Sequence, residues 1–466
     1  MARRVEYGDW QTPLPLAREV AELVSKRIRA PKTVVEPTCG RGAFLRAAAD
    51  RWPDASLVGY ELDPAYVEEA AAALGTRAEV RQADFFSVAW RRTLAALEGP
   101  LLLLGNPPWV TTATLGALDS KNLPPKAGIA GRAGLDSLTG ASNFDVSESM
   151  LRSLIEALDG QAFALAMLIK TSVARRLVQH LGAQARPLAG ELHHIDAKLH
   201  FGASVDASLM FVRHAADGNS CRWPVFESLH APAASRVLGL VRGTLTNDVH
   251  GFERTRPFEG QPEPAWRSGV KHDCSRVMEL RATPEGWAST AESTVQLEDE
   301  HVYPLLKGSD VANGRLTPRR AVVVPQKALA ESTATLEHTA PRTWAYLSRH
   351  RQALDARKSR IYRNRPPFSI FGIGPYTFAP FKVAIAGLYR RLAFQLVEPS
   401  DGKPIVLDDT CYFLPFEERA AAVQALTLLR SPAATEFFEA RVFWDAKRPI
   451  TKSLLSTLDL ARLPRP

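Results

Sequence analysis

Short apolar runs alternate with stretches of helical periodicity over the first half of the chain. The apolar runs cover residues 33–36, 56–61, 101–105, 162–169, 194–199 and 207–212, and the helical patterns cover residues 16–24, 64–74 and 147–158. Strands that alternate with helices are typical of an α/β fold with a mostly parallel sheet. The last two runs lie too close together for a parallel crossover, so we expect an antiparallel hairpin at one end of this sheet.

This alternation fades near residue 215, where basic, aromatic and proline-containing segments begin. We therefore predict two domains, residues 1–215 and residues 216–466, with the second starting between 216 and 240. Residues 111–142 are rich in Gly, Ala, Ser, Thr and Pro, and are too long and too polar for a tight connection. They are expected to form a mobile loop at an active site, or else a disordered segment without a role.

Composition narrows the possible partners. The 466 residues carry a formal net charge of +8 with a pI of about 9.3, which favours a polyanionic partner such as nucleic acid. The four cysteines are too scattered for a disulfide framework or a zinc site, so no metal is expected. The amino terminus lacks an apolar signal core and no apolar run approaches a membrane span, which predicts a cytoplasmic protein without a membrane partner.

The run Leu-Leu-Leu-Leu-Gly-Asn-Pro-Pro-Trp ends at Trp109 and carries the most informative chemistry. Proline cannot donate to a strand ladder, so residues 106–109 should form a turn at the end of a buried strand. The Asn106 side chain and the Pro107 carbonyl offer two acceptors, and Trp109 offers a flat ring. This set suits a planar group with an exocyclic amine; an ordinary strand-ending turn is the alternative.

A glycine loop follows the first strand in residues 34–45. Gly40 and Gly42 permit a tight turn whose backbone N–H groups, with a helix amino terminus, can face a carboxylate. The loop lacks the third glycine of a dinucleotide fingerprint and the Lys-Ser/Thr of a phosphate loop. Glu36, just before the loop, could meet the ammonium group of an amino-acid cofactor.

Acidic residues end the next two strands. Glu61 is placed to bind a ribose diol through two hydrogen bonds, whereas Asp63 is expected to cap the helix that begins at Pro64. Asp84 can accept a hydrogen bond from an adenine amino group, while Phe85 or the next phenylalanine covers the purine. Ligands of open α/β sheets bind at the carboxyl ends of strands, so these residues should meet at one edge.

In their order, these segments resemble the successive motifs of class I S-adenosylmethionine-dependent methyltransferases. Residues 106–109 resemble the Asn-Pro-Pro-aromatic motif of amino methyltransferases, most of all the gamma-type adenine-N6 DNA enzymes of restriction-modification systems. The likeness implies a Rossmann-like catalytic domain, a C-terminal α+β target-recognition domain and S-adenosylmethionine as cofactor. Residues 7–13 resemble an extra cofactor motif in which Thr12 and Pro13 contact the methionine end; a plain helix cap is the alternative.

The resemblance implies methyl transfer from the cofactor directly to the amine of a flipped adenine, with no covalent intermediate. Trp109 would be one stacking wall, and residues 201–208 resemble a late motif in which Phe201 supplies a second wall, although a core phenylalanine is equally consistent. In the second domain, Arg357, Arg360 and Arg363 surround Tyr362 and are candidates for phosphate or base contacts. A solvated charged face is the alternative there.

The expected partners are double-stranded DNA and, in a restriction-modification system, a separate restriction endonuclease. Methylation of an RNA base or of a protein glutamine would use the same turn, but the basic second half favours nucleic acid. Methylation of cytosine is less favoured because those relatives carry serine at the position of Asn106. A non-catalytic nucleic-acid-binding protein on the same fold is the remaining alternative, and the intact acidic positions count against it.

Overall fold

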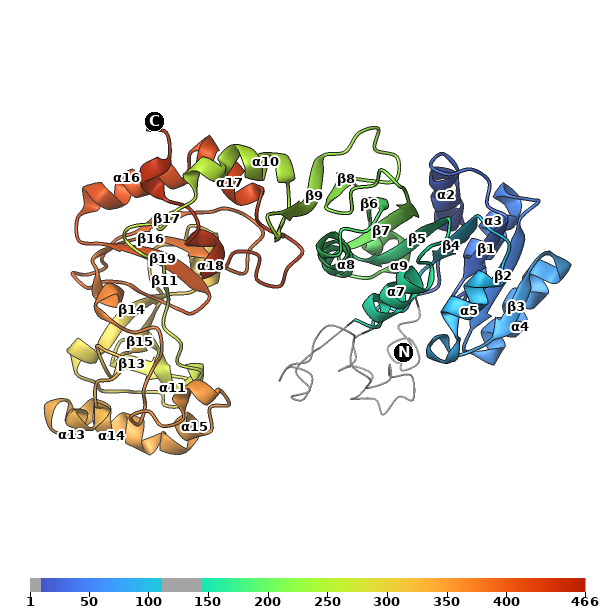
Figure 1. The fold of residues 1–466 in the computed structure, drawn as a ribbon. Helices are drawn as coiled ribbons and strands as arrows, with labels where there is room; N and C mark the ends of the chain where they lie inside the picture. The colour runs from blue at the N-terminus through green and yellow to red at the C-terminus, as the bar shows by residue number, and fades with distance from the viewer. Residues whose placement is uncertain (1–9, 111–144, 466) are drawn as a thin grey trace. The chain divides into compact units, whose positions relative to one another are not determined.

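The computed structural model of the protein describes residues 10–110 and 145–465 (Figure 1). The chain divides into two compact units, Met1–His250 and Gly251–Pro466, and each is described by itself. The predicted loop at residues 111–142 and the Tyr7–Asp9 part of the amino-terminal motif lie outside the described residues.

The first unit is built on one ten-stranded sheet with the order β10-β9-β8-β6-β7-β5-β4-β1-β2-β3. Its strands are β1 (Thr33–Glu36), β2 (Ser56–Glu61), β3 (Glu79–Gln82), β4 (Leu101–Gly105), β5 (Phe163–Lys170), β6 (Leu188–Ile195), β7 (Ala207–His214), β8 (Arg222–Phe226), β9 (Arg236–Val241) and β10 (Thr244–Thr246). The run from β3 through β2, β1 and β4 to β5 is parallel. Strand β7 is antiparallel to both β5 and β6. Consequently β6 runs in the same direction as β5, and the carboxyl ends of β1, β2, β4, β5 and β6 share one edge.

Helices cover both faces of this sheet. They are α2 (Leu14–Ser25), α3 (Ala43–Arg51), α4 (Pro64–Leu74), α5 (Trp90–Ala95), α7 (Val146–Ala157), α8 (Thr171–Ala183) and the short α9 (Ala197–Phe201). All five residues of β4 are buried, as expected for a strand covered on both faces. One core contains Leu16 and Val20 of α2, Phe44 of α3, and Leu102 and Leu104 of β4. Among the described helices, none has the length and apolar character needed to cross a membrane.

The predicted antiparallel pairing at the end of the parallel strands is confirmed, but one predicted strand is wrong. Strand β6 ends at Ile195, and the expected strand at residues 194–199 is replaced by helix α9. Asp196 starts that helix by accepting a hydrogen bond from the backbone of Leu199 at 2.9 Å, and Gly202 ends it in the left-handed region. The first unit also continues beyond residue 215, because β8 pairs with β6 and brings β9 and β10 into the sheet.

The second unit separates its strands from its helices, as an α+β fold does. One antiparallel sheet has the order β11-β19-β16-β17, with β11 (Arg267–Ser268), β16 (Phe381–Ala386), β17 (Gln395–Val397) and β19 (Cys411–Phe416). The other has the order β13-β12-β15-β14-β18, with β12 (Glu279–Thr283), β13 (Gly286–Ser289), β14 (Val302–Leu306), β15 (Arg320–Val323) and β18 (Val406–Leu407).

Helices flank each of these two sheets (Figure 1). They are α10 (Val249–Thr255), α11 (Ser275–Met278), α12 (Gly308–Ala312), α13 (Leu336–Thr339), α14 (Pro341–Arg349), α15 (Arg351–Asp355), α16 (Arg419–Leu429), α17 (Pro432–Glu439) and α18 (Lys452–Leu455). Separate apolar cores form beneath α14 and beneath α16 and α17, so each sheet has its own packed interior.

Candidate active site

A cavity of about 290 Å³ opens at the carboxyl ends of β1, β2 and β4 in the first unit. Most of the residues predicted to bind a cofactor line it. The lining includes Thr12, Glu36, Gly40, Glu61, Asp84, Phe85 and Asn106, together with Trp10, Gln11, Cys39, Tyr66, Pro108 and Met150. Segments that are distant in the sequence therefore meet at one edge of the sheet, as the strand-end pattern predicts.

The glycine loop turns sharply between β1 and α3. Gly40 and Gly42 have φ values of +50° and +75°, in the left-handed region that favours glycine. A Cβ atom at Gly40 would lie 2.6 Å from the Gln11 side-chain oxygen, so a larger residue would displace this neighbour. Gln11 also accepts a hydrogen bond from the backbone of Arg41 at 3.1 Å, which ties the amino-terminal segment to the loop.

Glu61 is held rigidly at the tip of β2. Its carboxylate accepts backbone hydrogen bonds from Gly40 at 2.7 Å, Leu62 at 2.8 Å and Asp63 at 2.9 Å. The Asp63 side chain instead caps α4 by accepting from the backbone of Ala65 at 3.0 Å, which confirms the helix-cap prediction. Glu61 is thus the acid that faces the cavity in a fixed orientation.

Glu36 adds a second carboxylate to the same wall. It is 3% exposed, and its oxygen accepts a hydrogen bond from the backbone of Leu45 at 3.1 Å. Burial raises the pKa of Glu36 well above its ordinary value, and the negative charge of Glu61 adds to the increase. Burial also raises the pKa of Glu61, even though its backbone donors act in the opposite direction. In the part of the chain that the structure describes, neither acid forms an ion pair, so a cationic ligand would relieve their repulsion.

Replacing Glu36 with glutamine is expected to stabilise the ligand-free protein, increasingly as pH rises above 4.5. Below that pH, Glu36 is protonated in both the folded and the unfolded chain. At higher pH the unfolded chain ionises first, so the wild type loses up to about 1.4 kcal/mol per pH unit until the folded pKa is reached. Thermal unfolding between pH 5 and 9 measures this, with Glu69→Gln as an exposed control. A difference that does not change with pH would contradict the assignment.

Asp84 and Phe85 follow β3 and form another wall of the cavity. One oxygen of Asp84 accepts a hydrogen bond from the backbone of Phe86 at 3.0 Å, which starts a turn of 3-10 helix at Phe85–Ser87. Phe85 is 5% exposed and its ring centroid lies 5.0 Å from that of Trp90. The indole of Trp90 donates to the Phe85 carbonyl at 2.9 Å. These contacts hold Phe85 in place beside the cavity.

Asn106 follows β4 directly and presents an unusual acceptor. Its side-chain nitrogen donates to the Trp10 carbonyl at 2.8 Å, which fixes the orientation of the amide. Its side-chain oxygen is buried and has no hydrogen-bond partner among the described residues. Such an orphaned acceptor is costly unless a ligand supplies a donor. The cavity wall therefore offers one acceptor for an incoming N–H group.

The two aromatic residues predicted as stacking walls are arranged differently from the expectation. Trp109 is 6% exposed and belongs to the core, and its indole donates to the Leu168 carbonyl at 3.2 Å. The Phe201 ring packs edge-on against it, with the centroids 5.2 Å apart. The rings therefore contact each other in place of facing an open slot, and their stacking role stays a prediction. Pro107 is buried and is not among the residues that line the cavity.

The sequence left two alternatives for Thr12 and Pro13, a contact with the cofactor or a plain helix cap, and the structure places one residue in each setting. Thr12 lines the cavity, whereas Pro13 is the N-cap residue of α2 and makes no side-chain cap hydrogen bond. Trp10 and Gln11 were not singled out as site residues, although both line the cavity. Their place beside Thr12 in the sequence was the available signal.

Lys170 is a further residue that the sequence did not reveal. Its ammonium donates to the Trp109 carbonyl at 2.9 Å and pairs with the buried Asp145 carboxylate at 2.7 Å. The backbone of Val146 also donates to the Val110 carbonyl at 2.9 Å. Lys170 therefore joins the turn after β4 to the start of α7 and holds the turn in place.

Only some of the arginines in the predicted basic cluster of the second unit are exposed. Arg357 donates to the backbone carbonyls of Leu354 at 2.7 Å, Ser369 at 2.8 Å and His272 at 3.2 Å, and it lies 3.7 Å from the centroid of the Tyr362 ring. Burial lowers the pKa of its guanidinium. Its Nε and Nη1 donors are used within the unit, which gives Arg357 a structural role, while its contact with a ligand stays a prediction.

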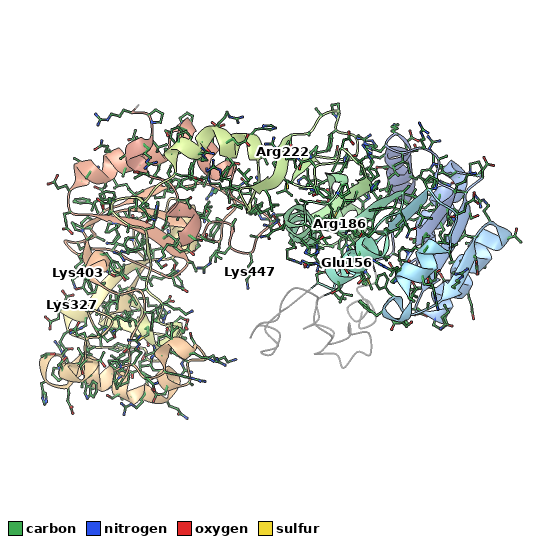
Figure 2. The ribbon with its side chains drawn as sticks, viewed as in Figure 1. Glu156, Arg186, Arg222, Lys327, Lys403 and Lys447 are labelled. Carbon is green, nitrogen blue, oxygen red and sulfur yellow. The ribbon has the colours of Figure 1, made fainter. Side chains whose placement is uncertain are left out.

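Arg360 and Arg363, by contrast, are exposed. Residues 307–391 contain 16 Lys and Arg against 4 Asp and Glu, so this part has a formal net charge of +12, compared with +8 for the whole chain. Figure 2 labels Lys327 and Lys403 on the second unit; Lys403 pairs with Asp299 at 2.6 Å, whereas Lys327 is exposed. A strongly basic stretch of this kind suits a phosphate backbone.

Comparison with known proteins gives three similarities. No family model matches the chain. Over 465 residues it is 38% identical to the type II methyltransferase M.NspV of Nostoc sp., covering 98% of this chain and 97% of M.NspV. A stretch of 115 residues is 31% identical to the type II methyltransferase M.XamI of Xanthomonas campestris pv. amaranthicola, covering 24% of this chain and 22% of M.XamI.

The fold is similar to that of MmeI, a type IIL restriction-modification enzyme whose structure was solved in complex with DNA. The TM-score is 0.53 at 13% sequence identity, and the match covers 95% of this chain. The chain spans 64% of the MmeI chain, slightly less than two thirds of its length.

Proposed function

Because this chain belongs to the type II methyltransferase family, we propose that it methylates the exocyclic amino group of a flipped adenine at a specific DNA sequence, with S-adenosylmethionine as donor. The observation that carries the choice of an amino group is the buried, unpartnered side-chain oxygen of Asn106 on the cavity wall. An amine supplies the hydrogen-bond donor that this oxygen lacks.

The acidic and polar side chains that line the cavity suit S-adenosylmethionine. Glu36 would receive the ammonium group, Glu61 the ribose hydroxyls and Asp84 the adenine amine, while Thr12 would contact the methionine end. The unpaired carboxylates of Glu36 and Glu61 favour a ligand with positive charge. When bound, the cofactor supplies a methyl group already activated by a sulfonium.

The residues of this chain would act on the target by positioning and polarity. Asn106, with the Pro107 carbonyl as predicted second acceptor, would take the two amine hydrogens and localise the nitrogen lone pair. The amine nitrogen would attack with both of its hydrogens in place, so no base is needed before the transfer and no covalent intermediate is required. The methylated nitrogen would then lose one proton to solvent. The hydrogen bond from Asn106 to the Trp10 carbonyl orients the acceptor before the target arrives.

DNA as substrate is supported by the relatives and by the charge of the second unit. M.NspV and M.XamI are type II methyltransferases, and MmeI was solved with DNA. These similarities do not favour an RNA base, a protein glutamine or a non-catalytic binding protein. Within a restriction-modification system the expected partner is a separate endonuclease that cuts the same sequence.

Mapping of modified bases tests this proposal. DNA from bacteria that express the protein should carry N6-methyladenine at one short sequence, and DNA from cells with the Asn106→Ala variant should lack it. Methylation of cytosine, or methylated RNA without methylated DNA, would contradict the proposal.

The exposed arginines of the second unit are expected to govern DNA affinity. Arg360→Ala and Arg363→Ala should each reduce the slope of log affinity against log salt by about 1, because each phosphate contact releases counterions. Arg254→Ala, at an exposed arginine paired with Glu436, is the matched control. Binding to a DNA duplex between 50 and 300 mM salt measures the effect, and unchanged slopes would exclude these contacts.

Arg357→Ala should instead lower the free energy of unfolding by about 1–3 kcal/mol, since it leaves buried carbonyls without donors.

A further inference from the structure

Two large apolar side chains are exposed on the short connection between β6 and β7. Leu199 on α9 is 76% exposed, and Val205 in the following loop is 41% exposed. The other exposed large apolar residues among those described are Leu62, Leu388 and Val423. None of these three exceeds 42% exposure, so Leu199 stands out.

The topology brings this connection to the candidate active site. Strand β6 is antiparallel to β7, which is antiparallel to β5, so the carboxyl end of β6 lies at the same edge as that of β4. Helix α9 is attached there through Phe201, whose ring lies 5.2 Å from that of Trp109. Trp109 follows Asn106 by three residues, so α9 packs directly against the turn that carries the amine acceptor.

Contacts near both ends of α9 hold the helix in place and leave Leu199 on its outer side. Ala197 is 2% exposed, and Phe201 packs against the core on the same side because residues four apart share a helix face. Leu199 lies between them in sequence and is therefore on the outer side. The Asp196 cap fixes the backbone nitrogen of Leu199 at 2.9 Å.

The charge beside Leu199 suits a nucleic acid. Lys198 is exposed next to it, and His200 follows it. Among the residues that the structure describes, Lys198 forms no ion pair. An apolar side chain with an adjacent cation matches the base stack and the phosphates of a duplex, respectively.

We propose that Leu199 is a wedge that enters the DNA base stack beside the target adenine, with Lys198 contacting a neighbouring phosphate. The proposal rests on the proposed function, because only an enzyme that flips its target leaves a gap in the stack. Flipping costs free energy in lost stacking and pairing, and an apolar side chain that fills the gap offsets part of this cost. The benefit should disappear when the target base is already unpaired.

Single-turnover methylation of two duplexes tests the wedge, once the methylated sequence has been mapped. One duplex has a normal base pair at the target, and the other has an abasic position opposite the target adenine. Leu199→Ala should lower the rate on the paired duplex at least tenfold and the rate on the abasic duplex less than threefold. Leu199→Met, which keeps an apolar side chain of similar length, should restore most of the rate on the paired duplex.

Val423→Ala is the matched control, because it removes an exposed apolar side chain on α16, outside the basic stretch at residues 307–391. It should not change either rate. Equal losses on the two duplexes, or no loss on either, would overturn the wedge. A change in self-association of Leu199→Ala without a change in rate would point to a contact between protein copies and would also overturn it. If the wild type methylates neither duplex, the proposed function itself is wrong.

Discussion

Asn106→Ala is expected to slow methyl transfer by about 10²- to 10³-fold while DNA binding survives, because removal of a preorganised polar group at a reacting atom has an effect of this size. The variant removes the orphaned acceptor on the cavity wall and the hydrogen bond to the Trp10 carbonyl. Transfer of labelled methyl groups measures the rate, and a gel-shift assay with the same duplex measures binding.

Two comparisons sharpen this test. Asn106→Asp keeps an acceptor but loses the donor to the Trp10 carbonyl, so its rate should fall between those of wild type and alanine variant. Asn219→Ala, in an exposed turn of the same unit, should leave the rate unchanged. Full activity of the alanine variant would show that the orphaned oxygen has no part in the reaction.

Glu61→Ala should weaken S-adenosylmethionine binding by about 100-fold or more. Two charge-assisted hydrogen bonds to a diol account for a loss of this order, at about 1.5–3 kcal/mol each. The variant also releases the backbone of Gly40, Leu62 and Asp63, so the glycine loop loses its anchor. Calorimetric titration of the cofactor in the absence of DNA measures the effect.

Glu68→Ala is the matched control for Glu61, since Glu68 is an exposed glutamate of α4 and is not among the cavity residues. Its cofactor affinity should equal that of the wild type. Wild-type affinity of Glu61→Ala would mean that the diol is bound elsewhere in the cavity.

Local signals explain why much of the fold was predictable. Helix α4 spans Pro64–Leu74 as expected, because Asp63 caps it and proline fits its first turn. Strands β1, β2 and β4 also have the expected bounds, since each is a short apolar run that ends at a turn residue. The confirmed α/β sheet, with its antiparallel strand, follows from these elements in their order.

Local capping in one case and long-range packing in the others account for the points that the predictions missed. The predicted strand at residues 194–199 was wrong because the Asp196 cap and Gly202 together favour a helix. Arg357 looked like its exposed neighbours, yet three backbone carbonyls from separate segments enclose it. The hydrogen bond between Trp109 and Leu168 is equally invisible in the sequence, because it depends on the register of β4 against β5.

The hydrogen bond between Asn106 and Trp10 ties the segment before α2 to the wall of the candidate site. Purification tags and fusion partners are therefore better joined to the carboxyl terminus. A bulky amino-terminal fusion that shifted Trp10 would inactivate a correctly folded enzyme, and a protein prepared in that way could be mistaken for one without activity.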